Sequence, residues 1–527
     1  MGSAYSTIAS DVIARYQRLQ GKRVRFVVGT DEHGEKIAEA AAARGLPPQA
    51  HCDQVVEQYK ELWQALDISY DTFIRTTDEV HARVVGEMMS RVWDRDVYRS
   101  EYRGWYCVGC EEYKDELELE PGHACPIHRK PCELREEDNY FFALSKYQAA
   151  LEDYLAKDNA AFVQPASDRN EVLSWVKSGL RDFSISRANV KWGIPVPQDG
   201  AQTVYVWFDA LVGYLTALLQ LRGPEKATLA DLKASGWPAS VHVIGKDILR
   251  FHAVYWPAML MAAGLPPPRR VFGHGFLTKD GLKMGKSLGN VLDPQALVGA
   301  YGPDAVRFFF MREIAFGSDG DFSEGRFQDT INASLANGLG NLLNRTLTML
   351  WKNAPAEPGQ PLCLARGAAQ VPGATRLAGA AERAAQAAQT AYEDLCLHQA
   401  CEAAVGLIAD ANLLLSELQP WHTFKKARQT RGGGSEEEKA AAIDALVAVL
   451  ETIRIAAVLL HPVVPRLAAR VLEQLGLDAS GLRWSDAAWG GLAAGQELRR
   501  PEPVFSRIQR DFVTEPARGG AHNRAAA

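Results

Sequence analysis

Three cysteines and one histidine near residue 110 have the spacing of metal ligands. In the stretch CVGCEEYKDELELEPGHACPIH, Cys107 and Cys110 form a C-x-x-C turn, and Cys125 and His128 form a C-x-x-H turn fourteen residues further on. Three thiolates and one imidazole suit tetrahedral Zn²⁺. Four protein ligands close the coordination shell, so we predict a structural zinc site. Reduced cysteines scattered in a loop are the alternative, and the paired spacing argues against it.

A second stretch concentrates lysines between glycines. GFLTKDGLKMGKSLGNVLDP carries Lys279, Lys283 and Lys286, with Ser287 alongside. Positive charge and backbone N–H donors on one loop suit a polyphosphate whose charge shifts during a reaction. Taken alone, such a loop is more often a solvated turn. The surrounding motifs therefore have to decide between the two interpretations.

The elements that position these residues alternate between helix and strand from the first residue. Apolar side chains recur at three- and four-residue steps between residues 5 and 19, which predicts a helix that ends at Gly21. The run VRFVV predicts a strand, GTDEHG a loop, and EKIAEAAAARG a helix that ends at Gly45. In parallel α/β proteins a strand precedes such a first helix, and ligands bind at the carboxyl ends of the strands. We therefore expect a strand before Met1.

The composition and the predicted secondary structure change along the chain. Clustered Cys, Gly and Pro interrupt the α/β pattern, strands return in VYVWF, VHVIG and RRVFGHGFL, and an Ala- and Leu-rich helical region comes after them. We predict a parallel α/β sheet interrupted by a zinc-bearing insertion and followed by an all-α bundle. The predicted domains are 1–97 (first half of the sheet domain), 98–200 (insertion), 201–325 (second half), 326–510 (helical domain) and 511–527 (disordered tail).

Composition places the chain among ordinary globular proteins. At 527 residues it is long enough for two to four domains, and its net charge of −6 does not advertise a nucleic-acid binder, although local basic surface decides that question. No apolar run of about 18 residues and no signal-peptide profile occur, so we expect a soluble protein. Four of the eight cysteines lie between residues 107 and 132, which favours a metal over disulfides. Cys132 is out of step with the paired turns.

Several motifs together resemble one family. KMGKS resembles the KMSKS loop of class I aminoacyl-tRNA synthetases, with Gly285 in place of the first serine. The opening MGSAYSTIASDVIARYQRLQG resembles the segment that begins after the first histidine of the HIGH signature in methionyl-tRNA synthetases. GTDEHG, the zinc knuckle, GLRDFSISR, KWGIPVP, YVWFDALVGY, VIGKDILRFHAVYWPAML and ELQPW occur in the order of that family. The resemblance covers nearly the whole chain. It indicates the bacterial or organellar type with one zinc knuckle.

This resemblance implies a fold and an activity. The fold is a Rossmann-like (HUP-type) catalytic domain, split by the connective insertion, with an anticodon-binding helical bundle. The activity is ATP-dependent ligation of methionine to its tRNA through methionyl-adenylate, with Mg²⁺ accompanying ATP and one structural Zn²⁺. The implied partners are initiator and elongator methionine tRNAs, methionine and ATP, and the chain is expected to be a monomer, cytoplasmic or in the mitochondrial matrix or plastid stroma.

The resemblance also implies roles for individual residues. Asp31 of GTDEHG would hold the α-amino group of methionine, since a carboxylate pairs with an ammonium. The implied methionine pocket consists of Trp207, Ala210, Leu211, Tyr214 and His252. An apolar aromatic pocket suits a flexible thioether. Without the resemblance, Asp31 would be a loop cap, the aromatic residues core, and His252 a buried histidine with satisfied hydrogen bonds.

The implied nucleotide and tRNA sites complete the set. The ATP-binding residues implied are Gly2, Ser3, Gly245, Asp247, Lys283, Lys286 and Ser287, with Lys283 and Lys286 catalytic. Gly245 lets the nucleotide approach the backbone and Asp247 accepts from ribose hydroxyls. The implied anticodon-binding residues are Asn341, Arg345 and Trp421. Hydrogen bonds and a stacking aromatic are how unpaired RNA bases are read.

The resemblance leads to one further expectation and leaves two alternatives open. The chain as printed lacks the first strand and the first signature histidine, so we expect an N-terminally truncated form that is nearly inactive in adenylate formation. A non-catalytic tRNA-binding paralogue is one alternative, favoured by the absent histidine and by Ser3. A synthetase for another amino acid of the same class is the other. The branched-chain enzymes carry a longer editing insertion, and the cysteine enzyme needs an open zinc position.

Overall fold

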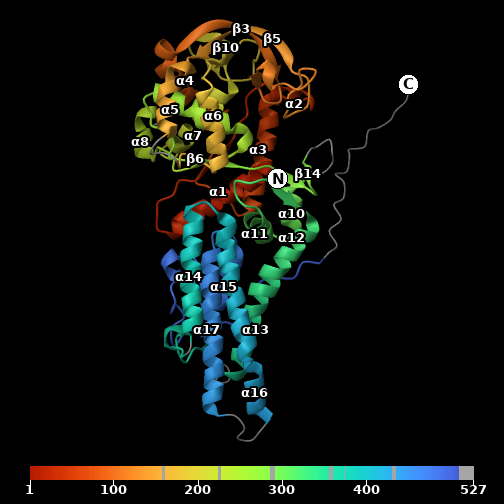
Figure 1. Cartoon of the computed structure of the whole chain (residues 1–527), viewed down its shortest axis with the longest axis vertical. Helices are drawn as coiled ribbons and strands as arrows, with labels where there is room; N and C mark the ends of the chain where they lie inside the picture. The colour runs from red at the N-terminus through yellow and green to blue at the C-terminus, as the bar shows by residue number, and fades with distance from the viewer. Residues whose placement is uncertain are drawn as a thin grey trace, which may run out of the picture. The chain divides into compact units, whose positions relative to one another are not determined.

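A computed structural model describes residues 1–156, 161–223, 227–284, 291–354, 360–372, 374–429 and 435–509. The chain divides into two compact units (Figure 1). Unit 1 comprises Met1–Val24, Ala65–Ile68 and the chain from Phe276 onward, and unit 2 comprises Arg25–Gln64 and Ser69–Gly275. The predicted tail, 511–527, lies outside the described residues.

Unit 2 contains most of the strands. Its first elements are β1 (Val27–Thr30), α2 (Glu35–Ala42), α3 (Pro48–Ala65), β2 (Thr72–Arg75) and α4 (Glu79–Asp96). Residues 97–204 then form β3 (Val97–Cys107), β4 (Glu112–Lys114), η1 (Glu116–Glu118), β5 (Glu133–Phe142), η2 (Leu144–Tyr147), α5 (Gln148–Ala156), β6 (Val163–Gln164), α6 (Ala166–Lys177), β7 (Phe183–Ser184), β8 (Ser186–Arg187), β9 (Pro195–Val196) and β10 (Asp199–Val204). The unit closes with α7 (Val206–Gln220), η4 (Leu229–Asp231), α8 (Leu232–Ser235), β11 (His242–Gly245), η5 (Lys246–Ile248), η6 (Phe251–Tyr255), α9 (Trp256–Ala262) and β12 (Val271–His274).

Parallel pairing occurs in two groups of strands in unit 2. β1 lies parallel to β2, and β11, β12 and β6 form a parallel sheet in the order β11-β12-β6. The predicted strands VHVIG and RRVFGHGFL are therefore confirmed. VYVWF as a strand is wrong, because β10 ends at Val204 and α7 begins at Val206. A continuous apolar run fits a buried helix as well as a buried strand, and α7 buries most of its surface.

Strands β3 and β5 of unit 2 form a long antiparallel ribbon. β3 pairs with β5 from Val97↔Phe142 to Tyr106↔Glu133, and the sheet runs in the order β4-β3-β5-β7. Cys107 is the last residue of β3, so the ribbon ends at the first predicted metal ligand. The two cysteines of the first turn are thus fixed at the end of a regular element.

Unit 1 is mainly helical. It contains α1 (Gly2–Leu19), β13 (Leu277–Lys279), β14 (Leu282–Lys283), α10 (Pro294–Tyr301), α11 (Pro303–Glu313), β15 (Gly320–Phe322), α12 (Glu324–Ile331), η8 (Asn332–Gly340) and α13 (Asn341–Asn353). It continues with β16 (Leu362–Cys363), η9 (Ala368–Gln370), α14 (Thr375–Glu393), α15 (Leu397–Leu418), α16 (Pro420–Gln429), α17 (Glu436–Leu460), α18 (Pro465–Gln474), η10 (Trp484–Ala487) and β17 (Glu497–Leu498). The predicted first helix and the predicted helical C-terminal region are confirmed.

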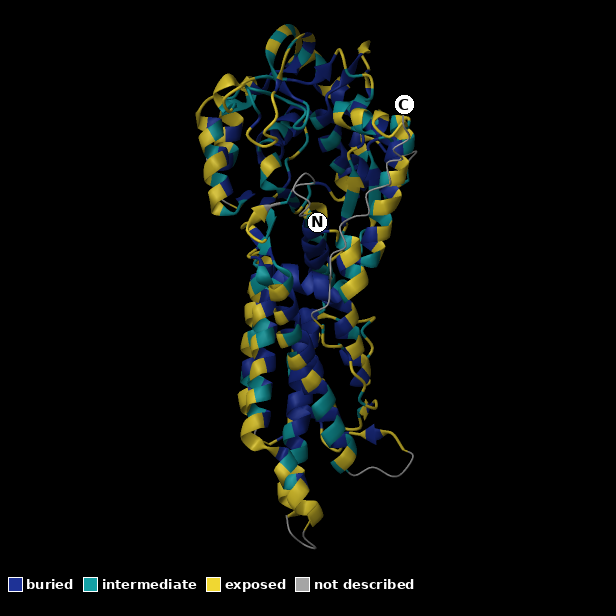
Figure 2. Cartoon of the chain, turned by 90° about the vertical axis from the view of Figure 1, so that its right-hand side faces the viewer, coloured by how far each residue is buried: buried dark blue, intermediate teal, exposed yellow. Residues whose placement is uncertain are grey.

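Helix α17 forms the centre of the bundle. Ser435 caps its N-terminus by accepting from the Glu438 N–H, and three glutamates in the first turn favour the helix dipole. Every residue from Leu446 to Leu460 is buried, and α14, α15 and α13 pack around it (Figure 2). A helix that is buried on all sides in this way is the core of a bundle. In the described part of the chain, every helix falls short of the length or apolarity that a bilayer crossing requires.

Candidate functional site

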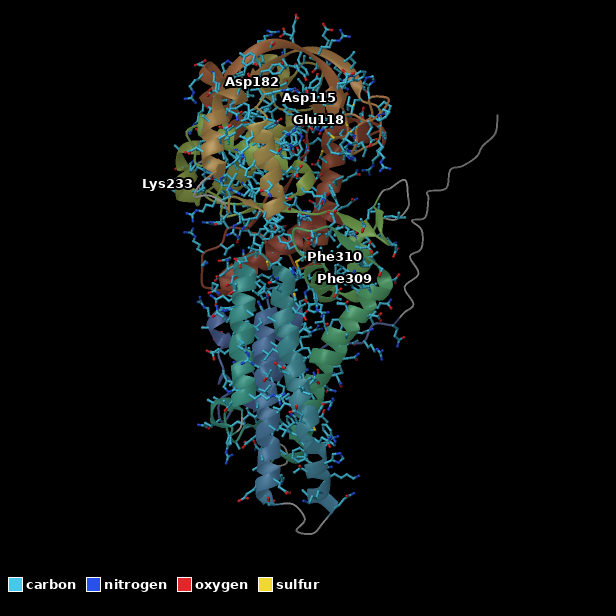
Figure 3. All side chains as sticks on the ribbon, viewed as in Figure 1. Asp115, Glu118, Asp182, Lys233, Phe309 and Phe310 are labelled. Carbon is cyan, nitrogen blue, oxygen red and sulfur yellow. The ribbon has the colours of Figure 1, made fainter. Side chains whose placement is uncertain are left out.

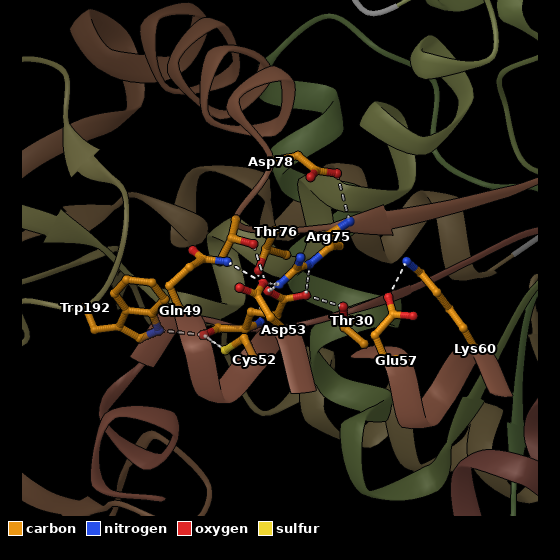
Figure 4. Close-up of polar contacts among 12 residues, drawn as sticks. Thr30, Gln49, Cys52, Asp53, Glu57, Lys60, Arg75, Thr76, Asp78 and Trp192 are labelled. Carbon is orange, nitrogen blue, oxygen red and sulfur yellow. Dashed lines mark hydrogen bonds and ion pairs between the residues drawn. The ribbon is translucent and has the colours of Figure 1, made fainter. Parts of the chain in front are cut away.

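The loop GTDEHG is held through the side chain of Glu32. Arg75 donates from Nε to Glu32 Oε1 at 2.8 Å and from Nη2 to Oε2 at 2.7 Å. The hydroxyls of Thr30 and Thr77 donate to the same carboxylate at 2.5 and 2.7 Å. Arg75 lies at the centre of this network, with Thr30 at its edge (Figure 4). These charge-assisted bonds hold the pKa of Glu32 below its ordinary value in spite of burial, so this carboxylate is an anchor and not a free ligand.

The backbone of the loop is held as firmly. The indole N–H of Trp192 donates to the Glu32 carbonyl at 2.6 Å (Figure 4). The Gly34 N–H donates to the Trp192 carbonyl at 3.0 Å. Gly34 has φ +102°, and a Cβ there would lie 2.1 Å from Glu111 Oε1. Only glycine fits this position. The KWGIPVP segment and the knuckle residue Glu111 therefore enclose the loop from two sides.

His33 anchors the loop on its other side. Asp209 of α7 accepts from His33 Nδ1 at 2.6 Å and from His81 Nε2 at 2.6 Å. Both histidines and the aspartate are buried. These bonds lower the pKa of Asp209 although burial acts to raise it. The sequence analysis did not identify Asp209, His33 or His81 as site residues; the one signal was an acidic residue inside an apolar helix.

Asp31 comes directly before the two anchors Glu32 and His33 and is exposed. Desolvation by neighbouring protein, followed by the charges of Asp209, Glu111 and Glu32, raises the pKa of its carboxyl well above the ordinary value. The backbone N–H of His33 donates to it and acts in the opposite direction. An acidic group held near other carboxylates gains most from a cationic ligand. The site can therefore bind an ammonium.

The predicted pocket residues of α7 lie on one helical face. Trp207, Ala210 and Tyr214 are half-buried and Leu211 is buried, at a spacing of i, i+3, i+4 and i+7. Asp31 acts electrostatically on Tyr214, so the acidic group and this face belong to one site in unit 2. The structure brings the predicted methionine-site residues together.

His252 completes this wall. Its Nδ1 donates to the Ile248 carbonyl at 2.9 Å, and its Nε2 accepts from the Tyr214 hydroxyl at 2.7 Å. Burial lowers the pKa of His252 to about 4, so the ring is neutral at pH 7. Phe251 stacks on Trp207 with ring centroids 4.0 Å apart, a contact that the sequence analysis did not predict.

The predicted metal ligands converge. The sulfur atoms of Cys107, Cys110 and Cys125 and a ring nitrogen of His128 all lie within 4.8 Å of one another. His128 Nδ1 lies 3.4 Å from Cys110 Sγ and 3.6 Å from Cys107 Sγ. Ligand atoms on the corners of a tetrahedron around Zn²⁺ are separated by about 3.5–4 Å given ligand distances of about 2.0–2.3 Å. The residues present fit a zinc ion. Cys132 lies beside Cys107 and outside this set.

The knuckle also contacts the pocket and the loop within unit 2. The Trp207 indole N–H donates to the Cys110 carbonyl at 3.4 Å. The Lys36 N–H donates to Glu111 Oε1 at 3.3 Å. Cys110 and Glu111 of the knuckle thereby contact the pocket at Trp207 and the segment that follows the loop at Lys36.

The predicted ribose-binding turn comes directly after a parallel strand. Gly245 ends β11 and pairs with His274 at the end of β12, so both strands end at the same edge of the sheet. Asp247 is exposed, and a Cβ on Gly245 would lie 2.4 Å from Asp247 Oδ1. The glycine therefore makes room for the aspartate. Ligands of open parallel sheets bind at this edge.

The remaining predicted ATP residues belong to unit 1. Gly2 and Ser3 are exposed at the start of α1. Lys283 lies in β14, whose backbone pairs with β13 through a turn at Asp280 and Gly281. The Lys283 side chain and residues 285–290, which include Lys286 and Ser287, lie outside the described residues.

Two of the predicted anticodon residues meet in the bundle. The Arg345 guanidinium of α13 lies over the Trp421 ring of α16, 5.7 Å from its centroid. Trp421 is half-buried, and Asn341 is exposed one helical turn before Arg345. A partly exposed aromatic ring beside a cation and an amide can stack and hydrogen-bond a base.

A separate hollow of about 460 Å³ lies in unit 2. Asp115, Glu118 and Asp182, which Figure 3 labels, are among its lining residues. Asp115 pairs with Arg181 at 2.9 Å and Glu118 with Arg250 at 3.3 Å. Asp115 and Glu118 are thus paired with arginines of the same unit, whereas Asp182 accepts from the Tyr98 hydroxyl at 2.8 Å.

Known families and structures match nearly the whole chain. The family described as "tRNA synthetases class I (M)" matches residues 1–130 and 115–347, and the family described as "Anticodon binding domain of methionyl tRNA ligase" matches residues 365–518. Methionine–tRNA ligase, chloroplastic/mitochondrial, of Arabidopsis thaliana is 56% identical over 97% of this chain and 80% of its own length. Methionine–tRNA ligase of Thermosynechococcus vestitus is 51% identical over 96% of this chain and 94% of its own length.

The match extends to three dimensions. The crystal structure of Mycobacterium tuberculosis methionyl-tRNA synthetase bound by methionyl-adenylate has a TM-score of 0.86 and 39% identity, covering 95% of this chain and 96% of that one. Relatives above 30% identity with this coverage share a family, and the family predicted from the motifs is confirmed. The chain belongs to the methionyl-tRNA synthetases, class I aminoacyl-tRNA synthetases with a helical anticodon-binding domain.

Proposed function

We propose that this chain joins methionine to ATP as methionyl-adenylate and transfers the methionyl group to its tRNA. The observation that carries the proposal is the electrostatic interaction of Asp31 with Tyr214 in unit 2, since Tyr214 shares one face of α7 with Trp207. Family membership supports the same reaction, and the Mycobacterium tuberculosis relative is named with methionyl-adenylate bound.

Asp31 binds the α-ammonium of methionine in this proposal. The carboxylate is crowded by Asp209, Glu111 and Glu32, so an incoming positive charge relieves repulsion as well as forming an ion pair. Attack of the methionine carboxylate on the α-phosphorus needs positioning more than covalent catalysis. Fixing the ammonium orients the carboxylate that attacks.

The wall of the pocket selects an apolar side chain. The Tyr214 hydroxyl and the neutral His252 ring satisfy each other, so neither offers a free donor to the ligand. Trp207, Ala210 and Leu211 supply the rest of the surface. A thioether makes favourable contacts with aromatic rings, whereas a hydroxyl or amide would lose its hydrogen bonds there.

ATP, with Mg²⁺, engages the second group of residues that we propose. Gly245 and Asp247 bind the adenosine, and Gly2, Ser3, Lys283, Lys286 and Ser287 bind the phosphates. Lysine charges near the phosphates stabilise negative charge as it develops in the transition state. Cys107, Cys110, Cys125 and His128 hold one structural Zn²⁺, which supplies cross-links and no chemistry.

For the tRNA we propose that Asn341, Arg345 and Trp421 read the anticodon, and that initiator and elongator methionine tRNAs are both substrates of a monomer. The Arg345–Trp421 contact supports this role. We also propose that the two parallel strand groups of unit 2 are parts of one Rossmann-like sheet, and that the domains are 1–97, 98–200, 201–325 and 326–510. The organellar name of the Arabidopsis relative supports an organellar location.

Pyrophosphate exchange tests the proposed function. The chain should exchange labelled pyrophosphate into ATP when methionine is present and should not do so with isoleucine, leucine, valine or cysteine. Asp31→Asn should weaken methionine binding by about 10- to 100-fold, since a hydrogen bond to a charged group contributes roughly 1.5–3 kcal/mol. Methionine binding without any exchange would support a non-catalytic paralogue, and exchange with another amino acid would refute the specificity.

A further inference from the structure

Asp209 is a fully buried carboxylate to which the proposed reaction gives no role. It accepts two 2.6 Å hydrogen bonds, from His33 Nδ1 and His81 Nε2, and His81 Nδ1 lies 2.9 Å from the Thr216 hydroxyl. His81 and Asp209 are each 0% exposed. A buried charge with two short partners costs much to desolvate, and a well-packed apolar group would serve a purely structural core better.

Asp209 lies at a position that connects the two walls of the methionine site. It is the residue before Ala210, so it belongs to the helix that supplies the apolar wall of the pocket. Its partner His33 belongs to the loop that supplies Asp31, and the His33 backbone N–H donates to the Asp31 carboxylate. A single short chain of contacts therefore joins the two walls of the methionine site.

The other anchor of the loop does not reach the apolar wall. Glu32 is bound by Arg75, Thr30 and Thr77, which belong to the ends of β1 and β2. It fixes the loop against the strands of unit 2. Within the described residues, the His33–Asp209 bond is the side-chain bond that ties this loop to α7.

We propose that Asp209 is a positioning residue which, through His33, sets the spacing between the Asp31 carboxylate and the apolar wall of α7, so that the ammonium and the thioether of methionine are bound together. This inference rests on the proposed function. It adds a residue that touches no substrate atom and still determines how well methionine fits.

The charges around Asp31 predict how methionine binding depends on pH, which gives a second test of the role of Asp209. The groups that face it are Asp209, Glu111, Glu32 and Tyr214, with the His33 N–H as donor. Methionine binding should weaken as pH falls, because protonated Asp31 cannot pair with an ammonium. Removing the charge of Asp209 should move this acid limb to lower pH, since a like charge near Asp31 is lost. A purely structural role for Asp209 predicts no such movement.

A double-mutant cycle on the full chain tests the proposal. Methionine dissociation constants are measured by calorimetry for the wild-type chain, Asp209→Asn, Asp31→Asn and the double variant. We expect Asp209→Asn to weaken binding about tenfold alone and less than about threefold in the Asp31→Asn background, because residues that act through one another are not additive. Asp96→Asn is the matched control, since Asp96 is a buried carboxylate of unit 2 bonded to Arg95 and Tyr147. It should change binding less than about twofold.

Two results would overturn the proposal. One is an Asp209→Asn variant that binds methionine as Asp96→Asn does with an unmoved acid limb. The other is the same loss of binding with and without Asp31. If the wild-type chain itself does not bind methionine, the proposed function fails, which is a different outcome.

A second pair of variants covers the case in which Asp209→Asn does not fold. His33→Asn keeps an N–H donor near the position of Nδ1, whereas His33→Ala removes it. We expect His33→Asn to bind methionine several-fold more tightly than His33→Ala, with the two chains unfolding at similar urea concentrations. Equal binding by the two variants would overturn the proposal.

Discussion

Replacing Arg307 with methionine should strongly destabilise unit 1. The Arg307 guanidinium is fully buried, and its Nη2 lies 2.7 Å from Asp11 Oδ2. It also donates to three backbone carbonyls, those of Val463 at 2.7 Å, Pro462 at 2.9 Å and Leu66 at 3.2 Å. One side chain thus joins α1, the Ala65–Ile68 segment and the turn before α18. No other residue type offers donors for all four acceptors in this geometry.

The size of the effect depends on the groups that lose their partner. Asp11 keeps one, because Arg15 Nε lies 2.7 Å from its Oδ2, so the carboxylate does not become fully unpaired. The three carbonyls lose their donor, at roughly 1–3 kcal/mol each, and the methionine side chain recovers part of this by apolar burial. We expect a net loss of about 3–5 kcal/mol, the range measured for breaking buried pairs. That is roughly a 100- to 1,000-fold or greater shift toward the unfolded unit.

Urea unfolding followed by far-UV circular dichroism measures this loss, with limited proteolysis to identify the unit that opens first. Arg312→Met is the matched control on the same helix, since Arg312 is partly exposed and its ion pairs with Glu313 and Glu402 are 3.4 Å long. Its cost should stay below about 1 kcal/mol. If Arg307→Met unfolds at the same urea concentration as Arg312→Met, the reasoning about the buried arginine is wrong.

Three further predictions concern zinc, RNA and pH. Cys110→Ser, or a chelator, should remove zinc from the chain and lower the stability of the insertion. It should also lower the affinity for methionine, because the Cys110 carbonyl accepts from the indole of Trp207 in the pocket. Metal analysis measures the zinc, and calorimetry measures the affinity. Trp421→Ala should weaken tRNA charging by about 1–3 kcal/mol while methionine-dependent pyrophosphate exchange stays near normal, and an equal fall in both would contradict the anticodon role. Burial lowers the pKa of His242 to about 3 and of His252 to about 4, below the unfolded value near 6.5. The unfolded chain therefore binds protons that the folded chain does not, and stability should fall as pH drops from about 6.5 toward 4, by up to about 1.4 kcal/mol per pH unit for each histidine. Urea midpoints of unit 2 at pH 7.5 and pH 5 measure this, and unchanged midpoints would contradict it.

The convergence of the four predicted metal ligands could be predicted from the sequence because their geometry is local. Each pair is set by a single turn, and the pairs meet because β3 and the following segment bring two short turns together. The distance between two ligands of one turn is fixed by the local backbone geometry, so it does not depend on the rest of the fold. Gly245 is also placed locally, at the end of β11 and two residues before Asp247.

The strand predicted at VYVWF shows where local reasoning fails. An uninterrupted apolar run carries no periodicity, so strand and buried helix give the same pattern. The tertiary environment decides, since α7 is packed by α4 and β2 and buries Phe208, Val212 and Leu215 fully while Trp207 and Tyr214 are half-buried. The resemblance assigns positions and not secondary structure, so the predicted pocket positions stay a prediction although their element was wrong.

The anchors of the GTDEHG loop were beyond prediction for a different reason. His33 and Asp209 are 176 residues apart and His81 and Asp209 are 128 apart, and no spacing rule links such positions. The sequence alone does not show which of Asp31, Glu32 and His33 is free to bind a ligand. In the structure Glu32 and His33 are anchors, and Asp31 is accessible. Which of three neighbouring polar side chains is free to bind a ligand depends on which groups satisfy the other two. A binding residue in a loop is therefore identified by its neighbours' partners, and those partners become known only when the chain is folded.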